Sequence, residues 1–421
     1  MRGPGSGGGP LRPLRGRGIA GLGTVIAIAI AAVAGCSGGH ATPVPSVTVA
    51  AATPPPSASS APTATGTATV TATVPVAPTA TPAGAGLFTP AGSMDATRGN
   101  ATLLRDGRVL MVGGNGDSDN ALGSAQLFDP RSGAYSRAAG TLASARFDPA
   151  VVVLQDGRVL VVGGEDGTQA PLASAELFDP SAGTFKVTGS MSTARSGATA
   201  FTLPDGNVLV IGGRAASGEA LASAEIFDPK SGQFSSTGSM TAARDAFGAA
   251  QLPDGRVVVV GGCCSVADPY SSAELYNPGT GVFTATGSMG AGRMFPALAV
   301  LSDGRVLVAG GNSSAVYEKP LASAEIFDPK TGTFTATGTM KAPRDGLDAT
   351  RLVDGRVLIC GGATDASAEL FDPGVGTFSL TGKMTTVRAG QSTATLLQDG
   401  RVFIAGGGAG QEAHSAEIYQ P

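Results

Sequence analysis

The sequence predicts an all-β protein, a seven-bladed β-propeller whose last blade is completed by the first strand of the folded region. Three observations predict it. A unit of about 49 residues recurs seven times, no helix-length apolar pattern follows residue 86, and each end of the repeated region holds only part of a unit. The composition agrees, because 64 Gly and 28 Pro among 421 residues suit many short strands joined by tight turns.

Each unit reads as four strands, a to d. In the third unit these are GATAFTL, NVLVIGG, SAEIFDP and QFSSTGSM, with PDG between strands a and b. Asp-Gly between two apolar runs is a strong hairpin signal, because Gly tolerates positive φ. Strand b is apolar on both faces, as expected for a strand packed between sheets. The Asp of this turn recurs as Asp106, Asp156, Asp205, Asp254, Asp303, Asp354 and Asp399, and paired glycines follow strand b at 113–114, 163–164, 212–213, 261–262, 310–311, 361–362 and 406–407.

The ends of the repeated region predict that the ring closes. The chain stops at SAEIYQP, a strand c with no strand d after it. The folded region begins at GLFTPAGSM, a strand d with no strand c before it. Residues 86–93 can therefore complete the seventh blade beside residues 414–420, which leaves no apolar blade face uncovered.

Four features of each unit together resemble the kelch motif: paired Gly, then Glu-x-[Tyr/Phe]-Asp-Pro, then Gly-x-aromatic, then Met-x-x-x-Arg. The resemblance covers residues 86–421 and implies a propeller of the galactose oxidase-like superfamily. One departure is that the Trp usual in strand d is replaced by a smaller ring. This ring is Phe88, Tyr135, Phe185, Phe234, Phe283, Phe334 and Phe378, and the Met position reads Met94, Leu142, Met191, Met240, Met289, Met340 and Met384.

Residues 1–36 read as a lipoprotein signal peptide. Four Arg precede an apolar run of about 15 residues, which is short for a membrane-spanning helix of about 20. The run ends in Val33-Ala34-Gly35-Cys36, which resembles a bacterial lipobox and implies lipidation of Cys36 with cleavage before it. An ordinary signal peptide cut near Ala34, or an uncleaved anchor helix, is the alternative.

Residues 37–85 are expected to be a disordered tether. They consist almost wholly of Ala, Thr, Pro, Val, Ser and Gly, and residues 41–85 carry no charge. Repeated X-Pro pairs disfavour helix, and no large side chain is present to build a core. We therefore expect an exported protein, lipid-anchored to the outer face of a bacterial membrane at the cell surface or in the periplasm.

Charge and cysteine content limit the classes of partner. The net charge is −4, and the chain has no basic tract, so it is a poor binder of nucleic acid. The four Cys show no CxxC spacing and no His partner, so no metal or other cofactor is expected. The adjacent Cys263 and Cys264 are either a vicinal disulfide or two free thiols. Cys360, in a strand b, is expected to be a buried small hydrophobe.

The first candidate site is a ring of arginines that open strand a in every unit and are expected near the mouth of the central channel. In some kelch propellers, arginines at this position bind acidic peptides, for which the planar guanidinium is suited. The alternative is a framework pair with the acidic or amide residue of strand c. The ring is Arg98, Arg146, Arg195, Arg244, Arg293, Arg344 and Arg388, and the strand c residues are Gln126, Glu176, Glu225, Glu274, Glu325, Glu369 and Glu417.

The second candidate site is formed by residues that break the repeat. The loops between strands b and c vary in length and content, and blades four and five supply Tyr270 and Tyr317. Near the mouth, Asp245 and Asp345 stand where other units have small residues, as do Asp148, Phe295 and Asp348. Loop residues carry function more often than framework residues do. Neutral drift of exposed loops is the alternative.

The sequence favours binding over catalysis. A copper radical oxidase of galactose oxidase type needs two His, two Tyr and a Cys, yet His414 is the only His after His40. A Ser or Cys triad lacks a suitable His as well. The remaining enzymatic alternative is a sugar lyase or epimerase that uses Arg and carboxylates on the propeller face. We therefore expect a monomeric, non-catalytic binding module for a protein, peptide or glycan.

Overall fold

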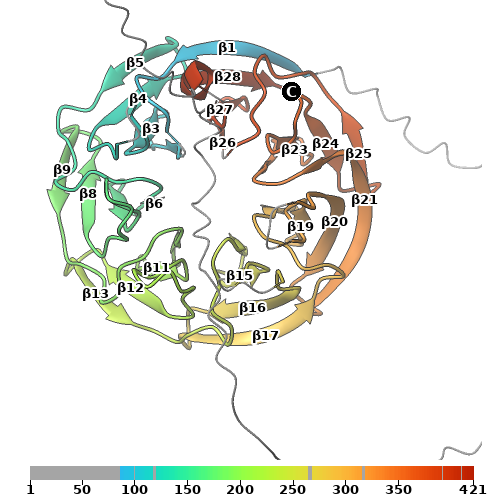
Figure 1. Cartoon of the computed structure of the whole chain (residues 1–421), viewed down its shortest axis with the longest axis horizontal. Coiled ribbons are helices and arrows are strands. Elements are labelled where there is room, and N and C mark those ends of the chain that lie inside the picture. Colours follow the sequence, from blue (N-terminus) through green and yellow to red (C-terminus); the bar gives the residue numbers. More distant parts are fainter. Residues whose placement is uncertain are drawn as a thin grey trace, which may run out of the picture. The chain divides into compact units, whose positions relative to one another are not determined.

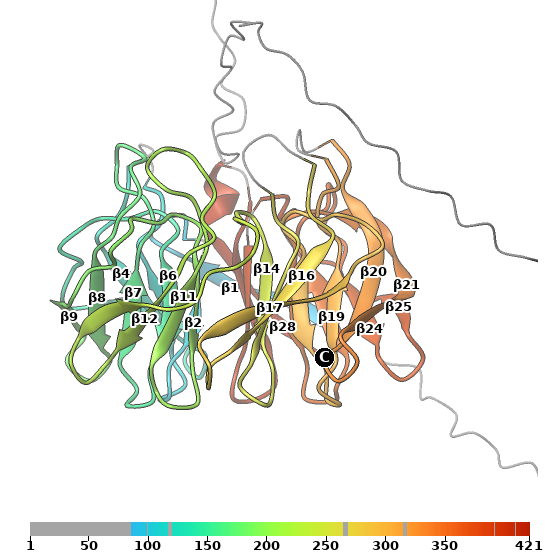
Figure 2. The same cartoon turned by 90° about the horizontal axis from the view of Figure 1, so that it is seen from below.

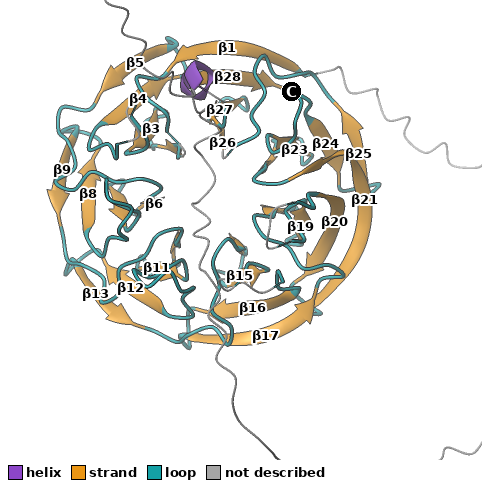
Figure 3. Ribbon diagram, viewed as in Figure 1, coloured by secondary structure: helices purple, strands orange, loops and turns teal. Residues whose placement is uncertain are grey.

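The computed structural model describes residues 86–421 except 99, 117–119, 264–267, 315–317, 391 and 409. These residues form seven antiparallel four-stranded sheets arranged radially around a common axis (Figure 1). The prediction of an all-β, seven-bladed propeller is confirmed. Figure 3 shows strands and loops throughout, with one short 3₁₀ helix, η1 (Gly410–His414). None of the helical structure in the described residues has the length and apolarity to cross a bilayer.

The strands of each blade follow chain order from the axis outward, except that the outermost strand of blade 7 comes from the start of the folded region. Blade 1 contains β2 (Thr102–Leu103), β3 (Val109–Val112), β4 (Ala125–Asp129) and β5 (Ala134–Arg137). Blade 2 contains β6 (Ala150–Val153), β7 (Val159–Val162), β8 (Ala175–Asp179) and β9 (Thr184–Val187). Blade 3 contains β10 (Thr199–Thr202), β11 (Val208–Ile211), β12 (Ala224–Asp228) and β13 (Gln233–Ser236).

Blades 4 to 7 follow the same plan. Blade 4 contains β14 (Gly248–Gln251), β15 (Val257–Val260), β16 (Ser272–Asn277) and β17 (Val282–Ser288). Blade 5 contains β18 (Ala297–Val300), β19 (Val306–Ala309), β20 (Leu321–Asp328) and β21 (Thr333–Arg344). Blade 6 contains β22 (Asp348–Arg351), β23 (Val357–Cys360), β24 (Glu369–Asp372) and β25 (Thr377–Leu380). Blade 7 contains β26 (Ser392–Leu396), β27 (Val402–Gly406), β28 (Ser415–Gln420) and β1 (Leu87–Ser93).

Blade 7 joins the two ends of the propeller, as predicted. Leu87 of β1 lies opposite Gln420 of β28, and the pairing continues to Ser93. The Gly86 backbone N–H donates to Thr381 Oγ1 of blade 6 at 3.1 Å. Gly86 therefore occupies in blade 7 the place of the glycine that ends the c–d turn in the other blades, and the ring closes without an extra element.

The core lies between neighbouring blades. All four residues of strand b are buried in blades 1 to 6, and the buried apolar residues divide into seven clusters, each shared by two adjacent blades. The strand d ring that replaces Trp packs on the aromatic residue of strand c. Phe88 and Tyr419 have centroids 4.7 Å apart, and Phe178 and Phe185 have centroids 4.8 Å apart.

The propeller has two different faces, which Figure 2 shows in side view. The loop face carries the b–c loops and the connectors that lead from strand d of one blade to strand a of the next; for blade 2 these are residues 163–174 and 138–149. The turn face carries the Asp-Gly turns and the c–d turns. Strand c runs from the loop face to the turn face, and Leu87 pairs with Gln420 at the C-terminal end of β28. Both ends of the propeller therefore lie at the turn face.

Candidate functional site

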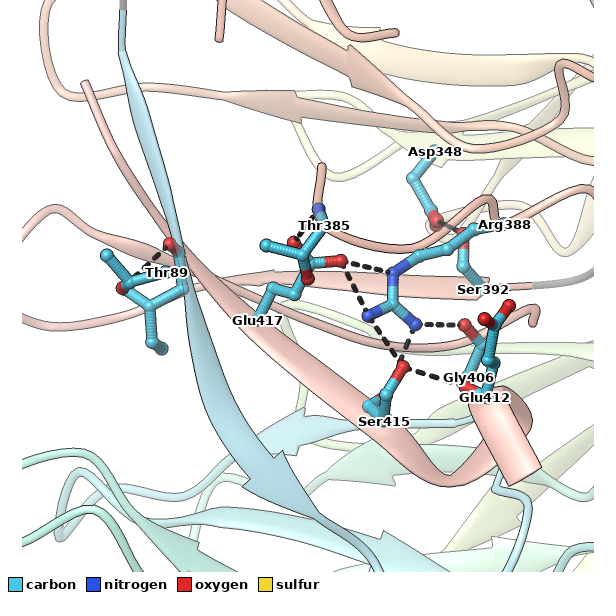
Figure 4. A network of polar contacts seen from close by, with 10 residues as sticks. Thr89, Asp348, Thr385, Arg388, Ser392, Gly406, Glu412, Ser415 and Glu417 are labelled. Atoms are coloured by element: carbon cyan, nitrogen blue, oxygen red, sulfur yellow. Dashed lines mark hydrogen bonds and ion pairs between the residues drawn. The ribbon is translucent and has the colours of Figure 1, made fainter. Parts of the chain in front are cut away.

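The seven arginines are held in the interior of their blades, each at most 1% exposed. In blade 2, Arg146 Nη1 donates to Gly163 O at 2.8 Å and to Ser174 O at 3.0 Å. Its Nη2 donates to Ser174 Oγ at 3.0 Å and to Glu176 Oε1 at 3.2 Å. The guanidinium therefore donates to carbonyls at the end of strand b and the start of strand c, where the backbone ladder between the two strands ends. Figure 4 shows the equivalent arrangement around Arg388.

The strand c glutamate also fixes the connector that enters the blade. Glu225 Oε2 accepts the Ser192 backbone N–H at 2.7 Å, and its Oε1 accepts the Thr193 N–H at 3.2 Å. The same carboxylate pairs with Arg195 at 3.2 Å. Each buried pair thus ties the preceding blade to the next. The pairs are Arg146–Glu176, Arg195–Glu225, Arg244–Glu274, Arg293–Glu325, Arg344–Glu369 and Arg388–Glu417, while Arg98 pairs with Asp95.

The hypothesis that these arginines bind a ligand at the channel mouth is therefore not supported, because none of them is exposed there. Each side chain turns away from the axis into its own blade, because a buried carboxylate and two carbonyl oxygens lie there. Burial lowers the pKa of the Arg98, Arg146 and Arg195 guanidinium groups, and the paired carboxylates oppose this change. Of the two roles weighed from the sequence, the geometry matches the framework pair, and no guanidinium of the ring is exposed to a ligand.

Asp245 and Asp345 lie on the loop face and are engaged by the preceding blade. Arg214, which follows the paired glycines of blade 3, donates from Nε to Asp245 Oδ2 at 3.0 Å. Asn312, at the same place in blade 5, donates from Nδ2 to Asp345 Oδ2 at 2.7 Å. Both carboxylates remain partly exposed. They therefore contribute negative charge to the loop face while they link neighbouring blades.

Tyr270 lies in a b–c loop, but its backbone makes a hydrogen bond that is repeated in other blades. Its backbone N–H donates to Gly262 O at 2.8 Å, as the N–H of Leu221 donates to Gly213 O at 2.8 Å one blade earlier. The ring lies over the guanidinium of Arg244, 5.2 Å from Cζ to the centroid. Tyr270 is thus the blade 4 counterpart of a repeated leucine. An alignment of the seven units on Ser223 and Ser272 reveals this substitution.

Three of the sequence-derived candidates lie outside the described residues: Tyr317, Cys264 and the lipidation site Cys36. Cys263 is half-buried, and its backbone pairs with that of Asp245. The choice between a vicinal disulfide and two thiols therefore stays open. Cys360 is fully buried, as predicted, and burial raises the pKa of its thiol.

Left-handed backbone at non-glycine residues is a feature of the loop face that sequence reasoning missed. Asp148, Ala246 and Phe295 have φ of 38°, 55° and 48°, two residues after the ring arginine. Blades 3 and 6 place Gly197 and Gly346 there, with φ of 62° and 64°. Such backbone costs an L-residue roughly 1–2 kcal/mol. The glycines at this position in blades 3 and 6 were the sequence signal that could have indicated the left-handed backbone.

Charge is shared unequally between the two faces. Outside the arginine ring and its carboxylate partners, the described loop face carries ten carboxylates and four cations. The carboxylates are Asp148, Glu165, Asp166, Glu219, Asp245, Asp268, Glu318, Asp345, Asp365 and Glu412, and the cations are Arg214, Lys319, Lys341 and Lys383. On the turn face the two signs nearly balance, because most Asp-Gly turns hold an arginine two residues later, as in the 2.6 Å pair of Asp106 and Arg108.

The described residues do not fit a copper centre. None of their His, Cys, Asp and Glu side chains gather in groups of three or more that could hold a metal ion. His414, the one histidine in this part of the chain, is half-buried at the end of η1. The two histidines that a galactose oxidase-type site needs cannot be assembled there.

Comparison with known proteins agrees with this geometry. The family model described as the kelch motif matches residues 146–192, 195–241, 248–290 and 293–341. No curated protein sequence matches the chain. Among solved structures, the chain is similar to a fungal alcohol oxidase of the AA5 family in complex with copper, with a TM-score of 0.66 and 20% sequence identity over 80% of this chain and 76% of that one. At this identity the likeness concerns the fold. The chain therefore contains kelch repeats and folds as a seven-bladed β-propeller.

Proposed function

We propose that this protein is an extracytoplasmic, lipid-anchored binding module that recognises a partner through its loop face without catalysing a reaction. A kelch propeller supports a binding or scaffold role in general. The observation that carries the proposal is the contrast between the interior and the loop face. All seven arginines are buried in ion pairs and hydrogen bonds inside the blades. The residues that differ from blade to blade lie on the loop face instead.

The sign of the charge on this face sets the class of partner. Carboxylates there outnumber cations by more than two to one, so an acidic peptide would be repelled. A basic polypeptide segment, rich in Lys or Arg, would be attracted and steered to the face. We therefore propose a partner protein with a basic segment. This reverses the charge that exposed ring arginines would have selected.

The position at which the chain enters the propeller also supports a binding surface on the loop face. Gly86 and Leu87 lie at the turn face, on the opposite side from the b–c loops. A membrane anchor joined to residue 86 would therefore not start from the binding surface. The lipid on Cys36 and the tether of residues 37–85 are part of this proposal.

The test is a binding measurement with matched charge variants of the full chain. A fluorescent Lys-rich peptide is titrated against the wild type, against Glu219→Gln/Asp268→Asn/Glu318→Gln on the loop face, and against Asp205→Asn/Asp228→Asn/Asp328→Asn on the turn face. We expect the loop-face variant alone to weaken binding by at least tenfold, and wild-type affinity to fall steeply with salt. Equal binding of a Glu-rich peptide, or equal loss in both variants, would refute the charge assignment. Turnover of an acidic sugar by the pure chain would contradict the proposal that the protein is non-catalytic.

A further inference from the structure

The two ends of the propeller meet at two places. Within blade 7, β1 from the start of the folded region pairs with β28 from its end. Beside this pairing, the hairpin of β26 and β27, which also belongs to the C-terminal end, packs on blade 1, which belongs to the N-terminal end (Figure 1). The second meeting place therefore joins the same two ends through residues outside β1.

Phe403 of β27 distinguishes this second contact from the other seams between blades. Its ring is fully buried and stacks on Phe128 of blade 1, with centroids 4.7 Å apart and 25° between the ring planes. Among the ring pairs of the described strands, this pair alone joins two blades. Stacked rings stabilise a contact beyond the area that they bury. The other blades have no aromatic residue in this register, where they carry Leu110, Leu160, Leu209, Val258, Leu307 and Leu358.

Two hydrogen bonds extend the contact across the turn face. Gln398 Nε2, in the turn between β26 and β27, donates to Arg105 O at 3.0 Å. Arg401 Nη2 donates to Pro130 O, in the c–d turn of blade 1, at 2.9 Å. Both acceptors are backbone carbonyls, so a substitution in blade 7 removes either bond without altering a side chain of blade 1.

The seam between blades 2 and 3 carries the same two hydrogen bonds but no ring pair. They run from Gln155 to Pro204 O at 3.1 Å and from Arg158 to Pro229 O at 3.3 Å. There the connector of residues 188–198 also joins the two blades covalently. The hydrogen-bonded residues of blades 7 and 1, by contrast, are 271 and 293 residues apart in the chain. Once β1 has left blade 7, only non-covalent contacts can hold these two blades together.

We propose that the propeller is closed twice, and that an inner closure made by Gln398, Arg401 and Phe403 keeps the ring closed when β1 detaches from β28. Any pull on residues 1–85 loads β1 first, because the chain enters the propeller at Gly86. Release of β1 would then leave blade 7 in contact with blade 1 and the loop face assembled. The inner closure depends neither on the proposed partner nor on the lipid anchor.

The test follows hydrogen exchange of the full chain in a background that releases β1. Gly382→Ala is this background, because a Cβ there would meet Gly86 O at the start of β1. We expect faster exchange in β1 and β28, with β3 of blade 1 and β27 of blade 7 unchanged. Adding Gln398→Ala/Phe403→Leu, which installs the leucine found in other blades, should accelerate exchange of β3 and β27 by about tenfold or more. With Gly382 intact, the same two substitutions should have a much smaller effect, because β1 still closes the ring.

The matched control adds Gln155→Ala/Leu160→Val to the Gly382→Ala background. Gln155 and Leu160 hold the corresponding positions at the seam between blades 2 and 3. Because the covalent connector remains at that seam, this control should leave the exchange of β3 and β27 as it is in Gly382→Ala alone.

Two results would overturn the proposal. One is exchange of β3 and β27 in Gly382→Ala alone that is accelerated as much as that of β1, because the ring would then open whenever β1 leaves. The other is an equal acceleration by the inner-closure variant and its control, which would indicate general destabilisation. If β1 stays protected in Gly382→Ala, Phe88→Ala, which removes the ring packed on Tyr419, releases β1 for the same comparison. The measurement involves no peptide, so this proposal and the proposed function fail separately.

Discussion

Asp95 forms an ion pair with Arg98 at 2.8 Å and takes the place that a strand c glutamate holds in the other six blades. Blade 1 has Gln126 in strand c, which cannot supply the charge. Gln126 Oε1 instead accepts the Asp95 backbone N–H at 3.2 Å. The carboxylate has moved from the strand to the connector three residues before the arginine, and the guanidinium remains neutralised.

This exchange predicts a rescue in blade 1. Asp95→Ala leaves Arg98 buried without a carboxylate, and removing one partner of a buried pair costs about 3 kcal/mol. Adding Gln126→Glu restores the arrangement of the other blades and should recover most of that loss. Chemical unfolding of the two variants measures both effects. Failure of the double variant to regain stability would show that Asp95 acts mainly through its second pair, with Arg137 at 2.9 Å.

The buried pairs should matter far more than the exposed ones. Glu225→Gln removes the charge opposite Arg195, both side chains being at most 3% exposed, and should destabilise the fold by about 3 kcal/mol. Asp156→Asn breaks the exposed pair with Arg158 on the turn face and should cost less than about 1 kcal/mol. Thermal unfolding of the two variants under identical conditions gives the comparison. Similar losses would contradict the framework role.

Closure of the ring by β1 should depend on Gly382. A Cβ at this residue would lie 1.9 Å from Gly86 O, at the point where β1 joins blade 7. Gly382→Ala should therefore displace the start of β1 and increase hydrogen exchange in both β1 and β28. Gly167→Ala is the control, since a Cβ there meets nothing within 4 Å. Protection of β1 equal to the wild type in Gly382→Ala would refute the closure contact.

Relief of left-handed backbone should stabilise blade 4. Ala246 has φ of 55°, which costs alanine roughly 1–2 kcal/mol, whereas glycine adopts this backbone freely and loses about 0.5–1 kcal/mol through its unfolded-state entropy. Ala246→Gly should therefore raise stability by about 0.5–1 kcal/mol. Ala200→Gly, inside β10, should lower it by about the same amount. Denaturant midpoints check both signs, and a destabilised Ala246→Gly would show that the alanine side chain contributes packing.

Much of the fold could be predicted from the sequence because each unit encodes its own hairpins and its own apolar strand. The Asp-Gly turns, the paired glycines and the incomplete units at both ends were sufficient for the number of blades and for the pairing of β1 with β28. The recurrence of the strand d aromatics was also visible in the sequence, and each ring packs on the aromatic residue of strand c, since a residue repeated in every blade meets the same surroundings each time.

The candidate site was less accessible to sequence reasoning. The position of the ring arginines was predicted, but the sequence left open whether their side chains face a ligand or the carboxylates of strand c. That direction depends on the carboxylate of strand c, about 30 residues away, which only folding brings within hydrogen-bond distance. The contact of Asp348 with Ser392 was equally hidden, because Ser392 belongs to the next blade.

The sequence by itself therefore determined the repeating unit, the count of blades and the closure of the ring, because local turn chemistry and apolar patterning act within one unit. The tertiary structure alone decided which repeated charges are buried, which face carries the surplus of carboxylates and where a lone aspartate meets the closing blade. Burial and charge compensation depend on distances between residues far apart in the chain, and those distances exist only after the blades have packed.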